Sequence, residues 1–163
     1  NDNMQWIKTV LIAMALCLSF NAAAMTDDDE AIWREALIQG QLKTVQQYVN
    51  ADAKAVNEKI FGWSPLQMAA NTNQLEVVKY LISKGAELDY MQPNAQHTAF
   101  HLAAFGRMTD MLTLLAKSGA DVNIKLRNDL SLVQFFRDEG DQKMITFLET
   151  LGVKDDGCKS EYC

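Results

Sequence analysis

The chain has 163 residues, of which 48% are hydrophobic and 22% are charged. This is the composition of a folded globular protein, and it excludes disorder as the main state. With 21 acidic against 15 basic residues, the net charge of −6 disfavours a non-specific nucleic-acid binder and docking on anionic lipid, since both need basic surfaces. Three cysteines are too few for a disulfide-built scaffold.

Residues 1–24 have the three-part layout of a secretory signal peptide. Lys8 supplies positive charge, residues 10–20 are almost entirely apolar, and residues 22–24 are the small alanines that an export peptidase reads. The apolar run is shorter than the roughly 20 residues of a membrane-spanning helix. We therefore expect cleavage after Ala24, a periplasmic or secreted location, and no membrane contact after cleavage. An uncleaved anchor and a buried N-terminal helix are the alternatives.

Two residues of this segment carry further expectations. Met4 is expected to be the natural first residue, with residues 1–3 added ahead of it. Cys17 suggests a lipoprotein, but lipidation sites require a small residue before the cysteine, and Leu16 is bulky. Cleavage without lipidation is the preferred interpretation.

The C-terminal tail, residues 154–163, contains the other two cysteines, Cys158 and Cys163. An even pair in an oxidising compartment is expected to form a disulfide. The enclosed loop is very short, so the expected gain in stability is small. The alternative is a frayed tail with two free thiols. The pair supplies too few ligands for a metal site.

Between these ends the sequence repeats itself. Residues 64–70 (SPLQMAA) recur 34 residues later as 98–104 (TAFHLAA), and weakly as 131–137. A second marker, residues 84–89 (KGAELD), recurs as 118–123 (SGADVN). Between the markers, apolar residues recur at helical spacing. A fixed period of this length predicts a stack of similar helical units.

Helix start and stop signals fall at the same places in each unit. Ser64 and Thr98 are expected N-caps, with Pro65 in the first helical turn, where no backbone N–H is needed. Gly85 and Gly119 follow the second helices, where glycine adopts the left-handed conformation at little cost. Further upstream, Thr26 and Asp29 predict a capping box ahead of the first helix.

Residues 64–70 and 98–104 resemble the T-P-L-H-x-A-A signature of ankyrin repeats, and 85–89 and 119–123 resemble the family's G-A-D-V-N. The resemblance implies an all-α ankyrin-repeat solenoid of about four helix-turn-helix repeats with short hairpin loops. It covers a domain over residues 25–153, with repeats at 30–57, 58–91, 92–124 and 125–153. Two departures from the signature are Ala99 for its proline and Gln67 for its histidine.

No nucleophile elbow, phosphate-binding glycine loop or H-E-x-x-H motif is present in the sequence. His97 and His101 are four residues apart and could share one helix face, but the sequence offers no obvious third metal ligand. The resemblance gives His101 a structural hydrogen-bonding role between repeats. We therefore expect no metal, no cofactor and no enzymatic activity.

Ankyrin arrays resemble a cupped hand, with hairpins as fingers and first helices as palm, which implies a concave face that binds another protein. Apolar residues at fingertips and palm are the candidates for contact. Trp63 and Tyr90 could instead pack within the array. The expected partner-binding residues are Phe61, Trp63, Asn71, Thr72, Tyr90, Met91, His97, Phe105, Lys125, Leu126 and Arg127.

The sequence thus predicts an exported, non-enzymatic module that binds another protein. Small exported bacterial ankyrin proteins resemble immunity proteins, so the sharpest hypothesis is an inhibitor that covers the functional site of an envelope-acting toxin. Two alternatives stay open: a periplasmic stress or scaffold factor that assists an enzyme, and a secreted effector that binds a host protein.

Overall fold

A computed structural model describes residues 26–155 and 157. The expected signal peptide, Cys158 and Cys163 lie outside this range. The described residues form helices joined by turns and hairpins. The α-helices are α2 (Asp27–Gln39), α3 (Leu42–Ala51), α4 (Pro65–Asn71), α5 (Leu75–Ser83), α6 (Ala99–Phe105), α7 (Thr109–Lys117), α8 (Leu132–Asp138) and α9 (Gln142–Thr150). Two short 3₁₀ helices are η1 (Ala53–Val56) and η2 (Arg127–Asp129).

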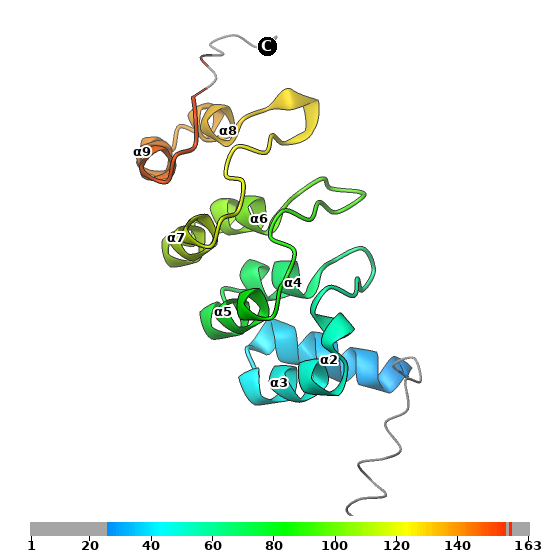
Figure 1. The fold of residues 1–163 in the computed structure, drawn as a ribbon. Helices are drawn as coiled ribbons and strands as arrows, with labels where there is room; N and C mark the ends of the chain where they lie inside the picture. Colours follow the sequence, from blue (N-terminus) through cyan, green and yellow to red (C-terminus); the bar gives the residue numbers. More distant parts are fainter. Residues whose placement is uncertain (1–25, 156, 158–163) are drawn as a thin grey trace, which may run out of the picture.

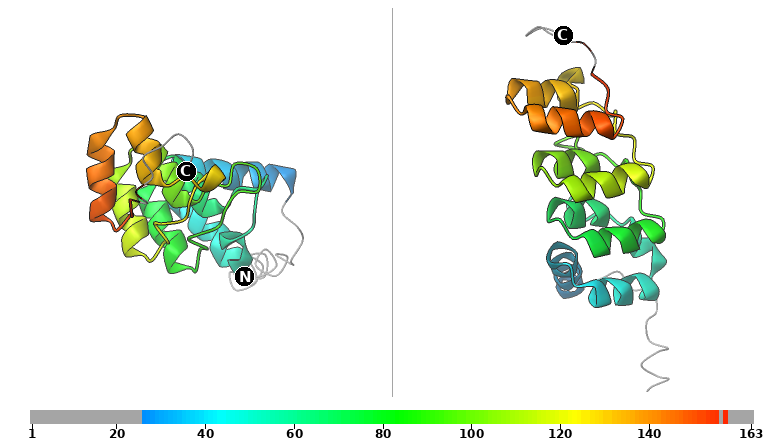
Figure 2. Two further views of the ribbon diagram at one scale, coloured as in Figure 1. Left: turned by 90° about the horizontal axis from the view of Figure 1, so that it is seen from above. Right: turned by 90° about the vertical axis from the view of Figure 1, so that its left-hand side faces the viewer.

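The α-helices form four antiparallel pairs that stack in chain order, as Figure 1 shows. The first helices of the pairs, α2, α4, α6 and α8, form one layer, and the second helices form the other (Figure 2). The loops that follow α3, α5 and α7 project beyond the first-helix layer and make the hairpins. The prediction of an all-α solenoid of about four repeats is confirmed.

The predicted N-caps are present at the starts of three first helices. The hydroxyl of Thr26 accepts a bond from the N–H of Asp29, that of Ser64 from Gln67, and that of Thr98 from His101. In each case the side chain of the third residue also accepts the N–H of the cap residue, which completes a capping box. Local sequence alone therefore sets where these helices begin.

The predicted glycine stops are also confirmed. Gly85 has φ +87° and Gly119 has φ +97°, a left-handed conformation that residues with a Cβ rarely adopt. This conformation ends α5 and α7 and turns the chain toward the next hairpin. The stops therefore set the spacing between second helices and hairpins.

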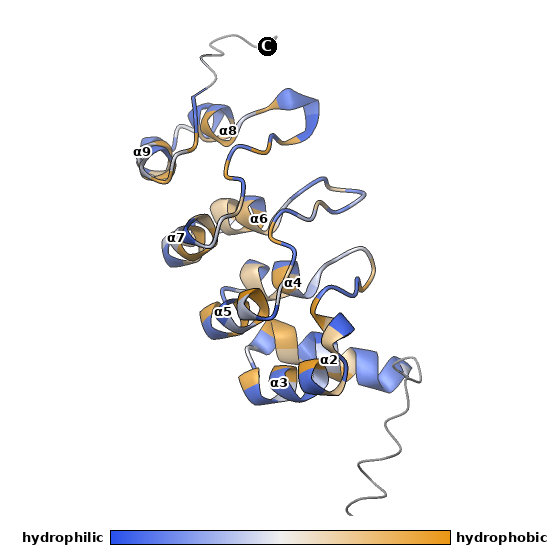
Figure 3. Ribbon diagram, in the orientation of Figure 1, coloured by the Kyte–Doolittle hydropathy of each residue, from blue (hydrophilic) through white to orange (hydrophobic). Residues whose placement is uncertain are grey.

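The core lies between the two helix layers and is continuous along the array. Apolar stripes on the helices face one another across it in Figure 3. Its small members, Ala36, Ala69, Ala70, Ala103 and Ala104, are completely buried, which lets neighbouring first helices approach closely. Trp33, Phe100 and Phe136 supply the largest buried side chains.

Polar side chains at the hairpin bases join consecutive repeats. Asn57 donates to the carbonyl of Gly85 (3.0 Å) and accepts the N–H of Glu87 (2.9 Å). Asn123 makes the same two bonds to Gly152 and Lys154. Each repeat thus satisfies backbone groups of the next, so the hairpin row is held in register.

Candidate protein-binding face

The first hairpin ends in a tight turn that presents Phe61 to solvent. Backbone N–H groups and carbonyls of Ile60 and Trp63 bond each other at 2.9 Å on both sides. Phe61 and Gly62 between them have φ values of +50° and +80°, the signs of a type I′ turn. Phe61 is 81% exposed, more than any other large apolar residue in the part of the chain that the structure describes.

Phenylalanine is an unfavourable residue at this turn position. Left-handed backbone favours glycine and asparagine, and a bulky side chain there costs on the order of 1 kcal/mol. In the other two hairpins the left-handed positions hold polar residues, Gln96, Asn128 and Asp129. Phe61 is not buried, and its left-handed backbone is unfavourable for phenylalanine. Its position therefore indicates a role other than stabilising the hairpin.

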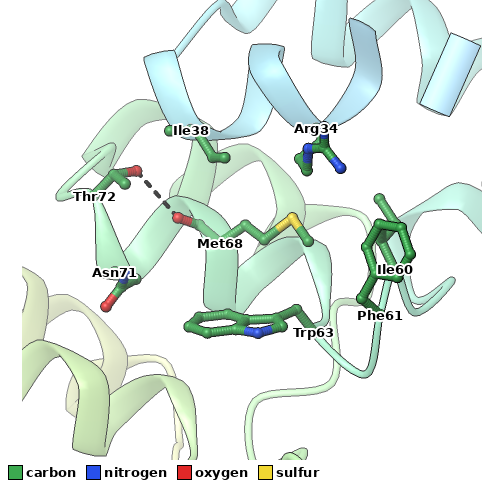
Figure 4. Close-up of a pocket in the computed structure, with 8 residues that line it drawn as sticks. All are labelled: Arg34, Ile38, Ile60, Phe61, Trp63, Met68, Asn71 and Thr72. Atoms are coloured by element: carbon green, nitrogen blue, oxygen red, sulfur yellow. Dashed lines mark hydrogen bonds between the residues drawn. The ribbon is translucent and has the colours of Figure 1, made fainter. Parts of the chain in front are cut away.

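Beside Phe61 lies a pocket of about 300 Å³ on the first-helix layer. Figure 4 shows Ile38 and Arg34 of α2 on one side and the Trp63 ring on the other, with Met68 of α4 between them. The wall is mainly apolar. The structure brings four of the predicted contact residues to this pocket: Phe61, Trp63, Asn71 and Thr72.

Trp63 and Tyr90 both serve partly as packing residues. Trp63 is half-buried against the core. The Tyr90 hydroxyl donates to the carbonyl of Gly62 (3.0 Å), and the Lys59 ammonium lies 4.2 Å from its ring centroid. Tyr90 therefore ties the second hairpin to the first. Met91 beside it is 37% exposed and remains available at the surface.

A row of aromatic rings continues across the next two repeats. The centroids of His97 and Phe105 are 4.9 Å apart, those of Phe105 and Phe135 5.0 Å, and Phe135 also contacts Phe136 at 5.0 Å. Phe135 was not among the predicted contact residues. Its position in the repeat corresponds to Met68 in the pocket, so the repeat register was the signal that could have found it.

The third hairpin differs from the expectation at Leu126. This side chain is only 8% exposed and belongs to the core, because the hairpin folds back with the Leu126 N–H bonded to the carbonyl of Leu130 at 2.8 Å. Leu126 is thus a packing residue and not a surface contact. Lys125 pairs with Asp129 at 3.0 Å, and Arg127 is exposed and donates to the carbonyl of Asn94 in the second hairpin.

His101 has the structural role that the resemblance implied. Its Nδ1 accepts the N–H of Thr98 at 3.0 Å, which places the proton on Nε2, and Nε2 lies 2.8 Å from the carbonyl of Ile124. Gln67 performs the same task one repeat earlier, since its amide bonds Ser64 on one side and the carbonyls of Tyr90 and His97 on the other. The family departure at Gln67 therefore preserves the bonding between repeats.

The burial of His97 and His101 makes folding stability depend on pH. Burial lowers the pKa of His101 below its ordinary value of 6.5, and burial followed by the charge of Arg127 lowers the pKa of His97. A lowered pKa means that the unfolded chain takes up protons before the folded one does. Stability is therefore complete above pH 6.5 and falls as the pH drops below it, by up to about 1.4 kcal/mol per pH unit for each proton.

We expect the urea concentration at the midpoint of unfolding to decrease when the pH is lowered from 7.5 to 5.5. In a variant with His97→Gln and His101→Gln, the midpoint should hardly change over this pH range, because the chain has only these two histidines. An equal decrease in the variant would contradict the assignment.

Over residues 26–155 and 157, no helix is both long enough and apolar enough to cross a membrane. Over the same residues, no cluster of three or more His, Cys, Asp or Glu side chains is placed to hold a metal ion.

A stack of helix pairs with projecting hairpins, whose apolar side chains meet on one face, defines a repeat-built interaction module. The family described as "Ankyrin repeats (3 copies)" matches residues 33–125. This chain therefore belongs to the ankyrin-repeat family, a protein-interaction module that is generally non-enzymatic.

Curated relatives share the repeat array at low identity. Over 125 residues the chain is 22% identical to "Ankyrin repeat, SAM and basic leucine zipper domain-containing protein 1" of Loxodonta africana, covering 74% of this chain and 26% of that protein. It is 28% identical over 135 residues to "Alpha-latrotoxin-Lg1a" of Latrodectus geometricus, covering 82% of this chain and 10% of that protein. The chain thus spans about a quarter or less of these relatives.

Proposed function

We propose that this protein is an exported, non-catalytic module that binds one partner protein through the surface made by its hairpins and first helices. The observation that carries the proposal is Phe61, which is 81% exposed at a strained turn position beside an apolar pocket. Large apolar side chains in such positions dominate the binding energy of protein interfaces. Export rests on the layout of residues 1–24.

In its sharpest form, the proposal is that the protein is an immunity protein, which inhibits an envelope-acting toxin by covering its functional site. Stoichiometric inhibition needs a rigid surface and no chemistry of its own. A stack in which every repeat packs on the next supplies such rigidity. The competing roles, a periplasmic stress or scaffold factor and a secreted effector, use the same face with a different partner.

The test is affinity capture of the C-terminally tagged protein from its native cells, with Phe61→Asn as the matched variant. Asparagine suits the left-handed turn, so the variant should fold with equal or slightly higher stability, by up to about 1 kcal/mol. We expect the wild type to retain one stoichiometric partner and the variant to lose it. Trp63→Ala is a weaker probe because it also removes core packing.

The partner decides between the roles. An isolated partner whose hydrolytic or pore-forming activity falls to zero at one equivalent supports the inhibitor role. A partner whose activity persists in the complex supports the scaffold role, and recovery of the protein from the medium supports the effector role. Capture of the same partner by wild type and Phe61→Asn would contradict the binding face.

A further inference from the structure

The pocket beside Phe61 has one charged residue in its lining. Arg34 of α2 stands at the rim, and the other lining residues are apolar or neutral. In Figure 4 its guanidinium lies at the same end of the pocket as Phe61 and Ile60, opposite Asn71 and Thr72. The pocket thus combines an apolar wall with a single positive charge at one end.

Within the described residues, the Arg34 guanidinium has no carboxylate partner. Its central carbon lies over the face of the Phe61 ring, 6.0 Å from the ring centroid, which is the outer limit of a cation–π contact. The other arginines are engaged within the array. Arg107 pairs with Asp141 at 2.7 Å, Arg127 donates to the carbonyl of Asn94, and Arg137 pairs with Asp155 at 2.6 Å.

The repeat register explains why Arg34 is unused. Gln41 and Gln74 both precede a second helix, and this offset of 33 residues places Arg34 at the position of Gln67. Gln67 and His101 at this position bond the carbonyls of the following hairpin. In the first repeat this position holds Arg34, which makes no such bond. Its side chain lines the pocket instead.

We infer that this pocket binds a large apolar side chain of the partner protein together with an Asp or Glu carboxylate next to it in that partner's sequence. The inference rests on the proposed function and specifies the chemistry of its partner. The apolar side chain fills the space between Ile38, Met68 and Trp63, and the carboxylate pairs with Arg34. A planar guanidinium with no competing acid suits this task, since charge-assisted bonds to carboxylates are strong and directional.

Because the overall charge is −6, the attraction between Arg34 and a carboxylate of the partner acts only at short distance. A broadly acidic partner is repelled at long range, and salt screens charges beyond about 8 Å at physiological strength. One carboxylate at the pocket rim is attracted by Arg34 at close range without requiring an acidic partner surface. The expected motif is therefore a single acid beside an apolar anchor and not an acidic run.

The experiment is selection of random twelve-residue displayed peptides on the immobilised full-length protein, in parallel with Arg34→Gln and Arg34→Glu. Wild type should enrich peptides with a large apolar residue and an Asp or Glu within two positions of it. Arg34→Gln should keep the apolar preference, lose the acidic one, and bind wild-type-selected peptides about tenfold more weakly. Arg34→Glu should enrich Lys or Arg in place of the acid.

Lys79→Gln is the matched control, because it removes one positive charge from α5, away from the pocket lining, where Lys79 pairs with Glu76. It should select the same peptides as the wild type. Circular dichroism melts of all four proteins should agree closely, because Arg34 makes no ion pair among the described residues and the exposed Lys79–Glu76 pair contributes little to stability.

The remaining outcomes separate the two proposals. If peptides lacking any acid are selected and Phe61→Asn abolishes their binding, the docking face stands and the role of Arg34 is overturned. If neither Phe61→Asn nor Arg34→Glu changes binding, the face itself is wrong. If no motif is enriched and light scattering shows a dimer that Phe61→Asn dissolves, a second copy occupies the pocket, which also overturns the inference.

Discussion

Replacing Phe100 by alanine is expected to lower the free energy of unfolding by about 3–5 kcal/mol. The side chain is only 1% exposed at the start of α6 and is one of the largest in the core. α6 packs on α4 and on α7, so a cavity there weakens the contacts of a central repeat with its neighbours. In a stacked array, loss of a central unit separates the units on its two sides.

Phe105→Ala is the matched control for this prediction. It makes the same substitution at the other end of α6. There the Phe105 ring is half-exposed and contacts the rings of His97 and Phe135. The two lost ring contacts lower the free energy of unfolding, and the expected additional loss is about 1 kcal/mol or less. Urea unfolding followed by circular dichroism measures both. Equal destabilisation by the two variants would show that the core does not pass through α6 as described.

Replacing His101 by alanine is expected to lower the free energy of unfolding by about 2–5 kcal/mol, more than the small size of the ring suggests. The substitution leaves the buried N–H of Thr98 and the carbonyl of half-buried Ile124 without their partners. Each unsatisfied buried group costs about 1–3 kcal/mol. The junction between the third repeat and the following hairpin should therefore open first.

His101→Gln should restore most of this loss, to within about 1 kcal/mol of the wild type. The chain itself supplies the precedent, because Gln67 makes the corresponding bonds in the preceding repeat. Thermal unfolding at pH 7.5 of the alanine and glutamine variants is the measurement. Equal destabilisation by both would mean that the histidine acts by ring packing and not by its two hydrogen bonds.

Most of the fold could be predicted from the sequence because its signals are local. The caps at Thr26, Ser64 and Thr98 and the stops at Gly85 and Gly119 depend on residues within one turn of each other. A repeated motif then multiplies each local signal. Gln67 departs from the family signature in the sequence, yet the structure shows that its amide makes the hydrogen bonds that His101 makes in the next repeat.

The candidate face was only partly predictable, because it depends on side chains from different repeats. The sequence singled out Phe61 and Trp63 as aromatic residues at a turn, but not Arg34, Ile38 and Met68, which complete the pocket from two other helices. It also placed Leu126 at the surface, although the third hairpin folds back and buries it. Phe135 entered the aromatic row through contacts that no single repeat contains.

The sequence by itself therefore determined the repeat family, the helix starts and stops and the absence of a recognisable catalytic motif, since these follow from spacing and short-range hydrogen bonding. Only the tertiary structure decided which side chains join consecutive repeats and which make no such bond. Arg34 and Gln67 occupy the same place in the repeat, but only Gln67 bonds the next hairpin. That difference arises from how successive repeats stack, which one-dimensional spacing does not specify.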